Sequence, residues 1–224
     1  MSVPDSAPFV SIPSGRLVME GVLELPPTPS GLVVFSHGSG SGRHSPRNRY
    51  VAQELRGAGL GTLLLDLLTP EEDRDYEMRF DINLLTHRLG DAVRFVRKHS
   101  ATRLLPVGLF GASTGAASAL RVAAAMREDV KAVVSRGGRP DLTGDEALSR
   151  VKAPTLLIVG GRDHGVIGLN QAAHALLRCE KSIAIVRGAT HLFEEPGALE
   201  EVAQFAADWF VRHLADGVRR NGMS

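Results

Sequence analysis

The sequence contains little cysteine and almost no net charge. One cysteine, Cys179, occurs in 224 residues, which excludes an intramolecular disulfide and a multi-cysteine metal site and fits a reducing compartment. The 26 lysine and arginine residues nearly balance 25 acidic residues, for a formal net charge of +1. Such a balance provides no general attraction toward nucleic acid or an anionic membrane. We therefore expect neither of them as a partner.

Long hydrophobic runs and a targeting segment are also missing. The first 13 residues contain no basic stretch followed by an apolar run, so no secretory signal is predicted. The apolar run 63–68 is interrupted by Asp66, and a bilayer span needs roughly 20 residues. We expect a cytoplasmic protein with a single domain over residues 1–224 and a core at about 9–214.

Short apolar segments alternate with longer amphipathic ones along most of the chain. Residues 9–12 and 17–25, joined by a Pro-Ser-Gly turn at 13–15, predict an antiparallel hairpin. The later alternation predicts successive βα units, hence an α/β fold with a mostly parallel central sheet and helices on both faces. The predicted parallel strands are 31–36, 61–67, 105–110, 131–135, 155–159 and 182–186.

Several helices carry boundary signals in the sequence. Ser45 followed by Pro46 indicates a helix start, and Gly57 with Gly59 indicates its end. Apolar residues at helical spacing predict further helices over 81–98 and 196–214, and an alanine-rich helix is expected to reach about residue 127. Loops expected to border a site at the sheet edge are 43–49, 69–80, 136–143 and 164–167, with their charged side chains mainly in solvent.

The sequence Gly-Ala-Ser-Thr-Gly at 111–115 lies between a predicted strand and a predicted helix. This is the context of a nucleophile elbow, a sharp turn that exposes a serine hydroxyl at the top of the sheet. Such a turn leaves no space for side chains two residues before and two residues after the serine, where Gly111 and Gly115 stand. We therefore predict Ser113 as the catalytic nucleophile.

A serine hydroxyl needs a general base, and the base needs an acid that orients it. His191 follows the predicted strand 182–186, and Asp163 follows the predicted strand 155–159, so both emerge at the carboxyl edge of the sheet. Position in the fold favours Asp163 as the acid. Asp141 follows an earlier strand and stays open as an alternative, although an aspartate after Pro140 also suits a turn or a helix cap.

Two backbone N–H groups would complete the site by binding the oxyanion of the tetrahedral intermediate. Thr114, at the start of the helix, is one predicted donor. Ser39, in the glycine-rich segment after the strand 31–36, is the other. A nucleotide role for this segment is disfavoured because Arg43 stands where either phosphate-binding fingerprint requires glycine.

These motifs, His37-Gly38, 111–115, Gly161-Arg162-Asp163 and Ala189-Thr190-His191, make the chain resemble an α/β-hydrolase of the dienelactone hydrolase-like group over residues 17–214. The resemblance implies an α/β-hydrolase fold. The elbow holds serine, whereas dienelactone hydrolase itself uses cysteine, so the resemblance favours a serine carboxylesterase. No long insertion follows the strand 131–135, which predicts a site without a large lid.

The expected reaction is hydrolysis of a small or extended carboxylic ester through an acyl-enzyme. The catalytic set is complete with protein groups, so neither a metal nor an organic cofactor is expected. A thioesterase or acyltransferase would use the same groups, and a binding or regulatory protein could keep the fold without turnover. The sequence leaves the oligomeric state and the natural substrate open.

Overall fold

The computed structural model describes residues 9–221, with side chains as far as Leu214. Eight strands form one sheet in the order β1-β2-β4-β3-β5-β6-β7-β8. Strands β1 and β2 form an antiparallel hairpin, β2 pairs antiparallel with β4, and all other pairs are parallel. The strands are β1 Phe9–Ser14, β2 Leu17–Glu24, β3 Leu32–Ser36, β4 Gly61–Leu65, β5 Val107–Ala112, β6 Val130–Arg136, β7 Thr155–Gly160 and β8 Lys181–Val186.

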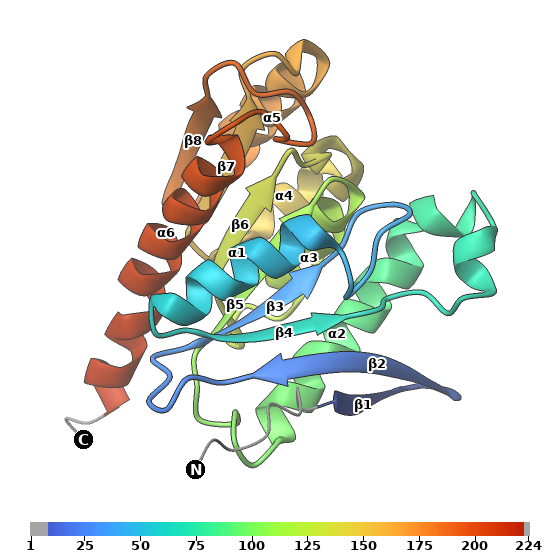
Figure 1. Cartoon of the computed structure of the whole chain (residues 1–224), viewed down its shortest axis with the longest axis vertical. Helices are drawn as coiled ribbons and strands as arrows, with labels where there is room; N and C mark the ends of the chain where they lie inside the picture. Colours follow the sequence, from blue (N-terminus) through green and yellow to red (C-terminus); the bar gives the residue numbers. More distant parts are fainter. Residues whose placement is uncertain (1–8, 222–224) are drawn as a thin grey trace.

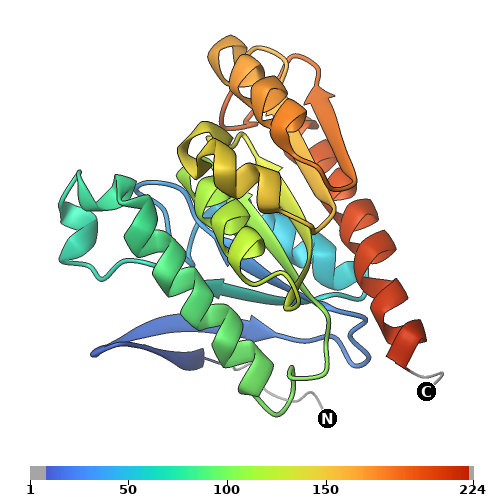
Figure 2. The same cartoon turned by 180° about the vertical axis from the view of Figure 1, so that it is seen from behind.

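Helices cover both faces of the sheet. Figure 1 shows α1 and α6 on the near face, and Figure 2 shows α2, α3, α4 and α5 on the opposite face. Successive residues of each central strand contribute to the two resulting cores, as Val33 and Val34 do. The helices are α1 Pro46–Gly57, α2 Ile82–Lys98, α3 Thr114–Ala125, α4 Asp145–Arg150, α5 His164–Leu176 and α6 Ala198–Asn221.

The predicted sheet, its hairpin and its coverage on both faces are confirmed. Ser45 caps α1 by accepting a hydrogen bond from Asn48 N–H, and Asp81 caps α2 through Leu84 N–H. The last helix begins at Ala198, two residues later than predicted, because Gly197 has φ 80° and stands outside helical geometry. The expected loop 164–167 is wrong, since these residues form the first turn of α5.

Short 3₁₀ turns occupy the connections at the carboxyl edge of the sheet. Between β4 and α2, residues 66–81 form a projecting segment with two such turns, η1 Glu72–Arg74 and η2 Met78–Phe80 (Figure 1). Between β6 and β7 the chain forms η3 Pro140–Thr143 and the short α4, so no large lid is inserted there. Within residues 9–221, no helix combines the length and hydropathy needed to cross a bilayer.

Candidate active site

Ser113 occupies a strained turn between β5 and α3. Its backbone has φ 51° and ψ −121°, a conformation that costs energy for a residue with a side chain. A Cβ on Gly111 would lie 2.5 Å from Ala116 Cα, and one on Gly115 would lie 2.5 Å from the His37 carbonyl oxygen. The two glycines therefore permit the close packing that holds this turn. Ser113 N–H also donates to the Arg136 carbonyl oxygen at 3.1 Å.

Asp163 and His191 come together at the same edge of the sheet. The distance from His191 Nδ1 to Asp163 Oδ2 is 2.7 Å, within the range of a strong hydrogen bond. The Asp163 side chain is 15% exposed and the His191 side chain 38% exposed, so the carboxylate is sheltered while the ring is partly open to solvent. Because Nδ1 binds the carboxylate, Nε2 points away from it. Nε2 can therefore accept a proton from a hydroxyl group.

Gly137 connects the histidine loop with the serine turn. A Cβ on Gly137 would lie 3.5 Å from His191 Cε1, and the preceding residue, Arg136, accepts the Ser113 N–H bond. Across the described residues, Ser113 Oγ makes no hydrogen bond to the His191 ring. In a free enzyme such bonds are often long and tighten only when substrate binds.

The alternative acid, Asp141, is engaged elsewhere. Its Oδ2 lies 2.7 Å from Arg139 Nη2, and Nε of the same arginine donates to Oδ1 at 2.9 Å. This ion pair raises the pKa of Arg139, mainly through the hydrogen bond to Asp141. The structure thus pairs Asp141 with a neighbouring cation and pairs His191 with Asp163.

Thr114 is the first residue of α3, directly after Ser113, so its N–H has no acceptor within the helix. On the opposite side, the 37–42 loop approaches Ser113: a Cβ on Gly38 would lie 3.0 Å from Ser113 Cβ. The next peptide carries the Ser39 N–H, the other predicted donor. Both predicted donors therefore lie beside the serine.

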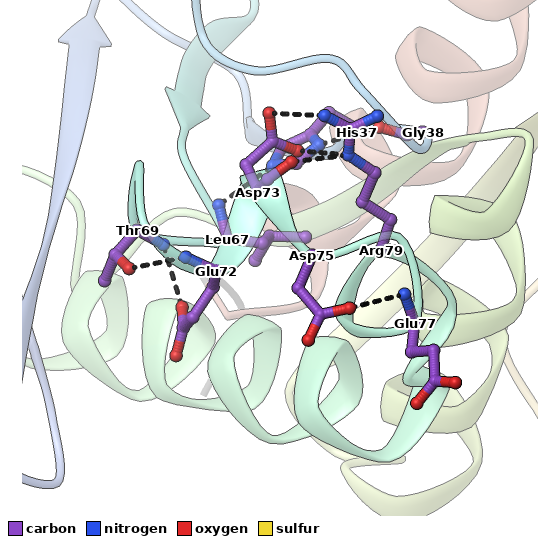
Figure 3. A network of polar contacts seen from close by, with 9 residues as sticks. All are labelled: His37, Gly38, Leu67, Thr69, Glu72, Asp73, Asp75, Glu77 and Arg79. Carbon is purple, nitrogen blue, oxygen red and sulfur yellow. Dashed lines mark hydrogen bonds and ion pairs between the residues drawn. The ribbon is translucent and has the colours of Figure 1, made fainter.

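His37 fixes the orientation of that peptide. Its buried ring accepts a hydrogen bond from Leu67 N–H at Nε2 over 2.9 Å, so Nδ1 carries the proton and donates to the Gly38 carbonyl at 3.0 Å (Figure 3). Burial lowers the pKa of His37, which keeps the ring neutral. In a trans peptide, C=O and N–H point in opposite directions, so holding the Gly38 carbonyl also sets the Ser39 N–H.

A cavity of about 470 Å³ lies between the 37–42 loop, the start of α1 and the projecting segment. Ser39 and Arg47 line it, together with Asp73 of the projecting segment. Arg79 links the two 3₁₀ turns of that segment, because its Nε donates to the Asp73 carbonyl at 2.7 Å (Figure 3). A Cβ on Gly40 of the loop would lie 3.5 Å from Arg79 Nη1. Ser39 lies on the wall of this cavity, whereas Ser113 and His191 do not line it.

Two residues around this site escaped the sequence analysis. Glu195 accepts the Thr190 N–H at 3.1 Å and so braces the loop that carries His191. Arg136 was expected in a solvated loop, but it is the last residue of β6 and is only 8% exposed. Neither residue stands in a motif that would have identified it. Among the side chains of residues 9–214, no group of three or more metal-ligating side chains comes together.

Residues 19–214 match the model of the dienelactone hydrolase family. The chain belongs to this family. It is similar to the crystal structure of a dienelactone hydrolase from Anabaena variabilis, with 53% identity and a TM-score of 0.90 over 92% of this chain and 97% of that one.

Curated relatives carry different names. A Mycobacterium tuberculosis protein named "Putative phosphoribosyl transferase" is 58% identical over 205 residues, which cover 92% of this chain and 46% of that protein. The chain thus spans about half the length of this relative. A Bradyrhizobium protein named "Probable 2-oxo-3-(5-oxofuran-2-ylidene)propanoate lactonase" is 28% identical over 65% of this chain and 66% of its own length.

Proposed function

We propose that this dienelactone hydrolase family member is a serine hydrolase that cleaves carboxylic esters through an acyl-enzyme. The observation that carries the proposal is the 2.7 Å contact between His191 and Asp163 at the sheet edge where the strained Ser113 turn stands. A strained, glycine-flanked serine and a carboxylate-bound histidine are the parts that acyl transfer requires.

In the proposed first step, Ser113 Oγ attacks the ester carbonyl carbon while His191 Nε2 takes the hydroxyl proton. Asp163 holds the ring and stabilises its positive charge as the proton arrives. The carbonyl oxygen becomes an oxyanion and accepts hydrogen bonds from the N–H groups of Ser39 and Thr114. When the tetrahedral intermediate collapses, the C–O bond to the alcohol breaks and His191 returns the proton to the leaving oxygen.

Water completes the cycle by the same route. His191 removes a proton from a water molecule, whose oxygen attacks the acyl carbon, and the second tetrahedral intermediate releases the carboxylic acid and restores Ser113. As the bond between the acyl carbon and Ser113 Oγ breaks, His191 returns that proton to Oγ, so the free serine is regenerated and the net reaction is hydrolysis. The proposed substrate is a small-molecule ester.

The names of the relatives support an ester bond as the target. A lactone is a cyclic ester, and both the Anabaena structure and the Bradyrhizobium protein carry lactone-hydrolase names. The transferase name belongs to a protein about twice as long as the matched span. For the span shared with that protein we propose ester hydrolysis.

The test compares Ser113→Ala with Ser39→Ala. Loss of the nucleophile should reduce kcat for p-nitrophenyl acetate by at least about 10⁴-fold, since a triad acts as a unit. Ser39 is proposed to act through its backbone N–H, which alanine retains, so this control should keep activity within about 3-fold of wild type. A fluorophosphonate probe should label the wild type and the control stoichiometrically and leave Ser113→Ala unlabelled. Hydrolysis by folded Ser113→Ala at the wild-type rate would refute the proposal.

A further inference from the structure

Arg136 is a buried cation that has no acidic partner among the described residues. It is 8% exposed, and its Nε and Nη1 atoms are buried without a hydrogen-bond partner. Most arginines near this edge of the sheet are paired, as Arg139 is with Asp141 and Arg43 with Asp66. A buried guanidinium without a counterion destabilises the fold. Its presence therefore points to an anionic ligand that binds there.

The position of Arg136 ties it to the candidate active site. In the sheet it pairs with Ala112, the residue before the nucleophile, and its own carbonyl accepts the Ser113 N–H. Its guanidinium carbon lies 6.0 Å from the centre of the Phe193 ring, two residues beyond His191. The cation therefore sits between the serine turn and the histidine loop.

A second cation lies nearby. Arg47, at the start of α1, lowers the pKa of Arg136 by charge repulsion, after the larger effect of burial, to about 10. At neutral pH Arg136 nevertheless keeps its charge. Arg47 pairs with the exposed Glu194 through Nη1 at 3.1 Å, whereas its Nε is buried without a partner. One exposed carboxylate thus pairs with Arg47, and no acidic side chain of the described residues forms an ion pair with Arg136.

We propose that Arg136, assisted by Arg47, binds an oxyanion group, a carboxylate or a phosphate, on the substrate of Ser113. This inference rests on the proposed ester hydrolysis and adds that the ester is anionic away from its reacting carbonyl. Arg47 lines the 470 Å³ cavity that Ser39 also lines, so a substrate group that enters this cavity from the Ser39 N–H extends toward Arg47, the neighbour of Arg136. Guanidinium groups bind both oxyanions through paired N–H donors.

A structural role for Arg136 predicts a different result. If its only task were to pack on Phe193 and brace the His191 loop, removing the cation would slow neutral and anionic substrates alike. If it binds the substrate, the loss concerns anionic substrates and leaves neutral ones unchanged. Substrates of equal reactivity and different charge separate the two roles.

The kinetic test uses three p-nitrophenyl esters: hexanoate, the adipate half-ester, and the same acyl length ending in a phosphonate. Wild type should favour at least one anionic ester over hexanoate in kcat/KM, and Arg136→Met should lose about 10- to 100-fold on that ester, the scale of one charge-assisted hydrogen bond. Hexanoate hydrolysis should change less than about 3-fold in kcat/KM. The preferred anionic ester tells whether a carboxylate or a phosphate is bound.

Arg139→Met is the matched control, because this arginine is nearby but already neutralised by Asp141. It should keep the anionic preference. Arg136→Lys, which retains a charge, should keep part of the preference and serves in place of the methionine variant if that variant does not fold. Equal losses on hexanoate and on the anionic esters, or no anionic preference in wild type, would overturn the subsite.

A binding measurement separates this inference from the proposed function. Inorganic phosphate and acetate are titrated against wild type and Arg136→Met in a thermal-shift assay, and fluorophosphonate labelling is run in parallel. At least one of the two anions should raise the Tm of wild type more than that of the variant. Without such a difference the subsite fails even if Ser113 is labelled, whereas unlabelled Ser113 beside a clear difference would overturn only the hydrolase proposal.

Discussion

The proposed nucleophile, Ser113, has an energetically unfavourable backbone conformation. Positive φ in a residue with a side chain costs on the order of 1–3 kcal/mol, and this turn is held by the close packing of Gly111 and Gly115 and by the bond to the Arg136 carbonyl. In exchange, the hydroxyl stands clear of the sheet, where a base can approach it. The strain is therefore confined to this turn, and contacts with the neighbouring strands and with α3 stabilise it.

The assignment of the acid is tested by two asparagine variants. Asp163→Asn should lower kcat by about 10²- to 10⁴-fold, because the amide no longer holds the His191 tautomer with Nε2 free or stabilises the charged ring. Asp141→Asn should lower it by less than about 3-fold, since its carboxylate binds Arg139. Steady-state kinetics on one ester measure both. A large loss confined to Asp141→Asn would transfer the role to that residue.

His37 gives the stability of the protein a pH dependence with a definite sign. Burial lowers the pKa of the ring below its ordinary value of 6.5 in the folded state. The unfolded chain therefore binds the proton first as pH falls, so this contribution is complete above about pH 6.5 and is lost as pH drops toward the folded-state pKa.

Urea unfolding at pH 7.5 and pH 5.5 measures this effect. Wild type should lose more unfolding free energy between the two pH values than His37→Asn, in which the titrating ring is absent. Other groups are common to both proteins, so the difference isolates His37. The same variant should reduce kcat by about 10-fold or more, because the Ser39 N–H is no longer fixed by the ring. An identical loss of stability in both proteins would contradict the buried neutral ring.

At the scale of single elements, two helical glycines differ in the space around them: a Cβ would clash at Gly115 but not at Gly168. A Cβ on Gly115 would lie 2.5 Å from the His37 carbonyl oxygen and closer still to that of Ser36, and backbone atoms cannot move aside cheaply. Gly168 lies in α5 with nothing within 4 Å of its Cβ position. The same substitution should therefore have opposite effects at the two positions.

Gly115→Ala should destabilise the fold by about 2 kcal/mol or more, the range of overpacking, and should abolish ester hydrolysis by displacing the turn. Gly168→Ala should stabilise it by about 0.5–1 kcal/mol, since alanine is the better helix former. Denaturant unfolding reads both changes, and activity is measured beside it. A Gly115→Ala variant as stable and as active as wild type would disprove the tight packing of the elbow.

Elements with local signals were predictable from the sequence. Ser45 and Asp81 cap their helices, and alternating apolar runs marked the strands, because caps and periodicity act over a few residues. The three proposed catalytic residues followed from strand order in the same way. Arg136 did not, since its burial depends on α1 and the loop after β8, which lie far away in the sequence.

The projecting segment was missed for the same reason. Sequence reading placed a solvated loop at 69–80, but the structure ties this region to α2. Arg88, 4% exposed, binds Glu72 at 2.6 Å through Nη2 and donates to the Leu67 carbonyl at 2.6 Å through Nη1. Nothing within the segment itself indicates this long-range partner.

Across the whole molecule, one sheet serves two cores. Leu32 and Val34 of β3 face the core under α2 and α3, whereas Val33 and Phe35 face the core under α1 and α6. Because the same strands line both layers, removing either layer of helices would expose the sheet to water. The two cores should therefore unfold together.

Trp209 provides the probe for this coupling. It is the only tryptophan in the sequence, lies on α6, and its Nε1 donates to the Pro154 carbonyl just before β7 at 3.3 Å. Its fluorescence reports the α1 and α6 layer, while far-UV circular dichroism is dominated by all helices. Urea transitions followed by the two signals should coincide in midpoint and slope, as one cooperative unit requires. A fluorescence transition that precedes the loss of helix signal would mean that α6 detaches while the opposite layer stays folded.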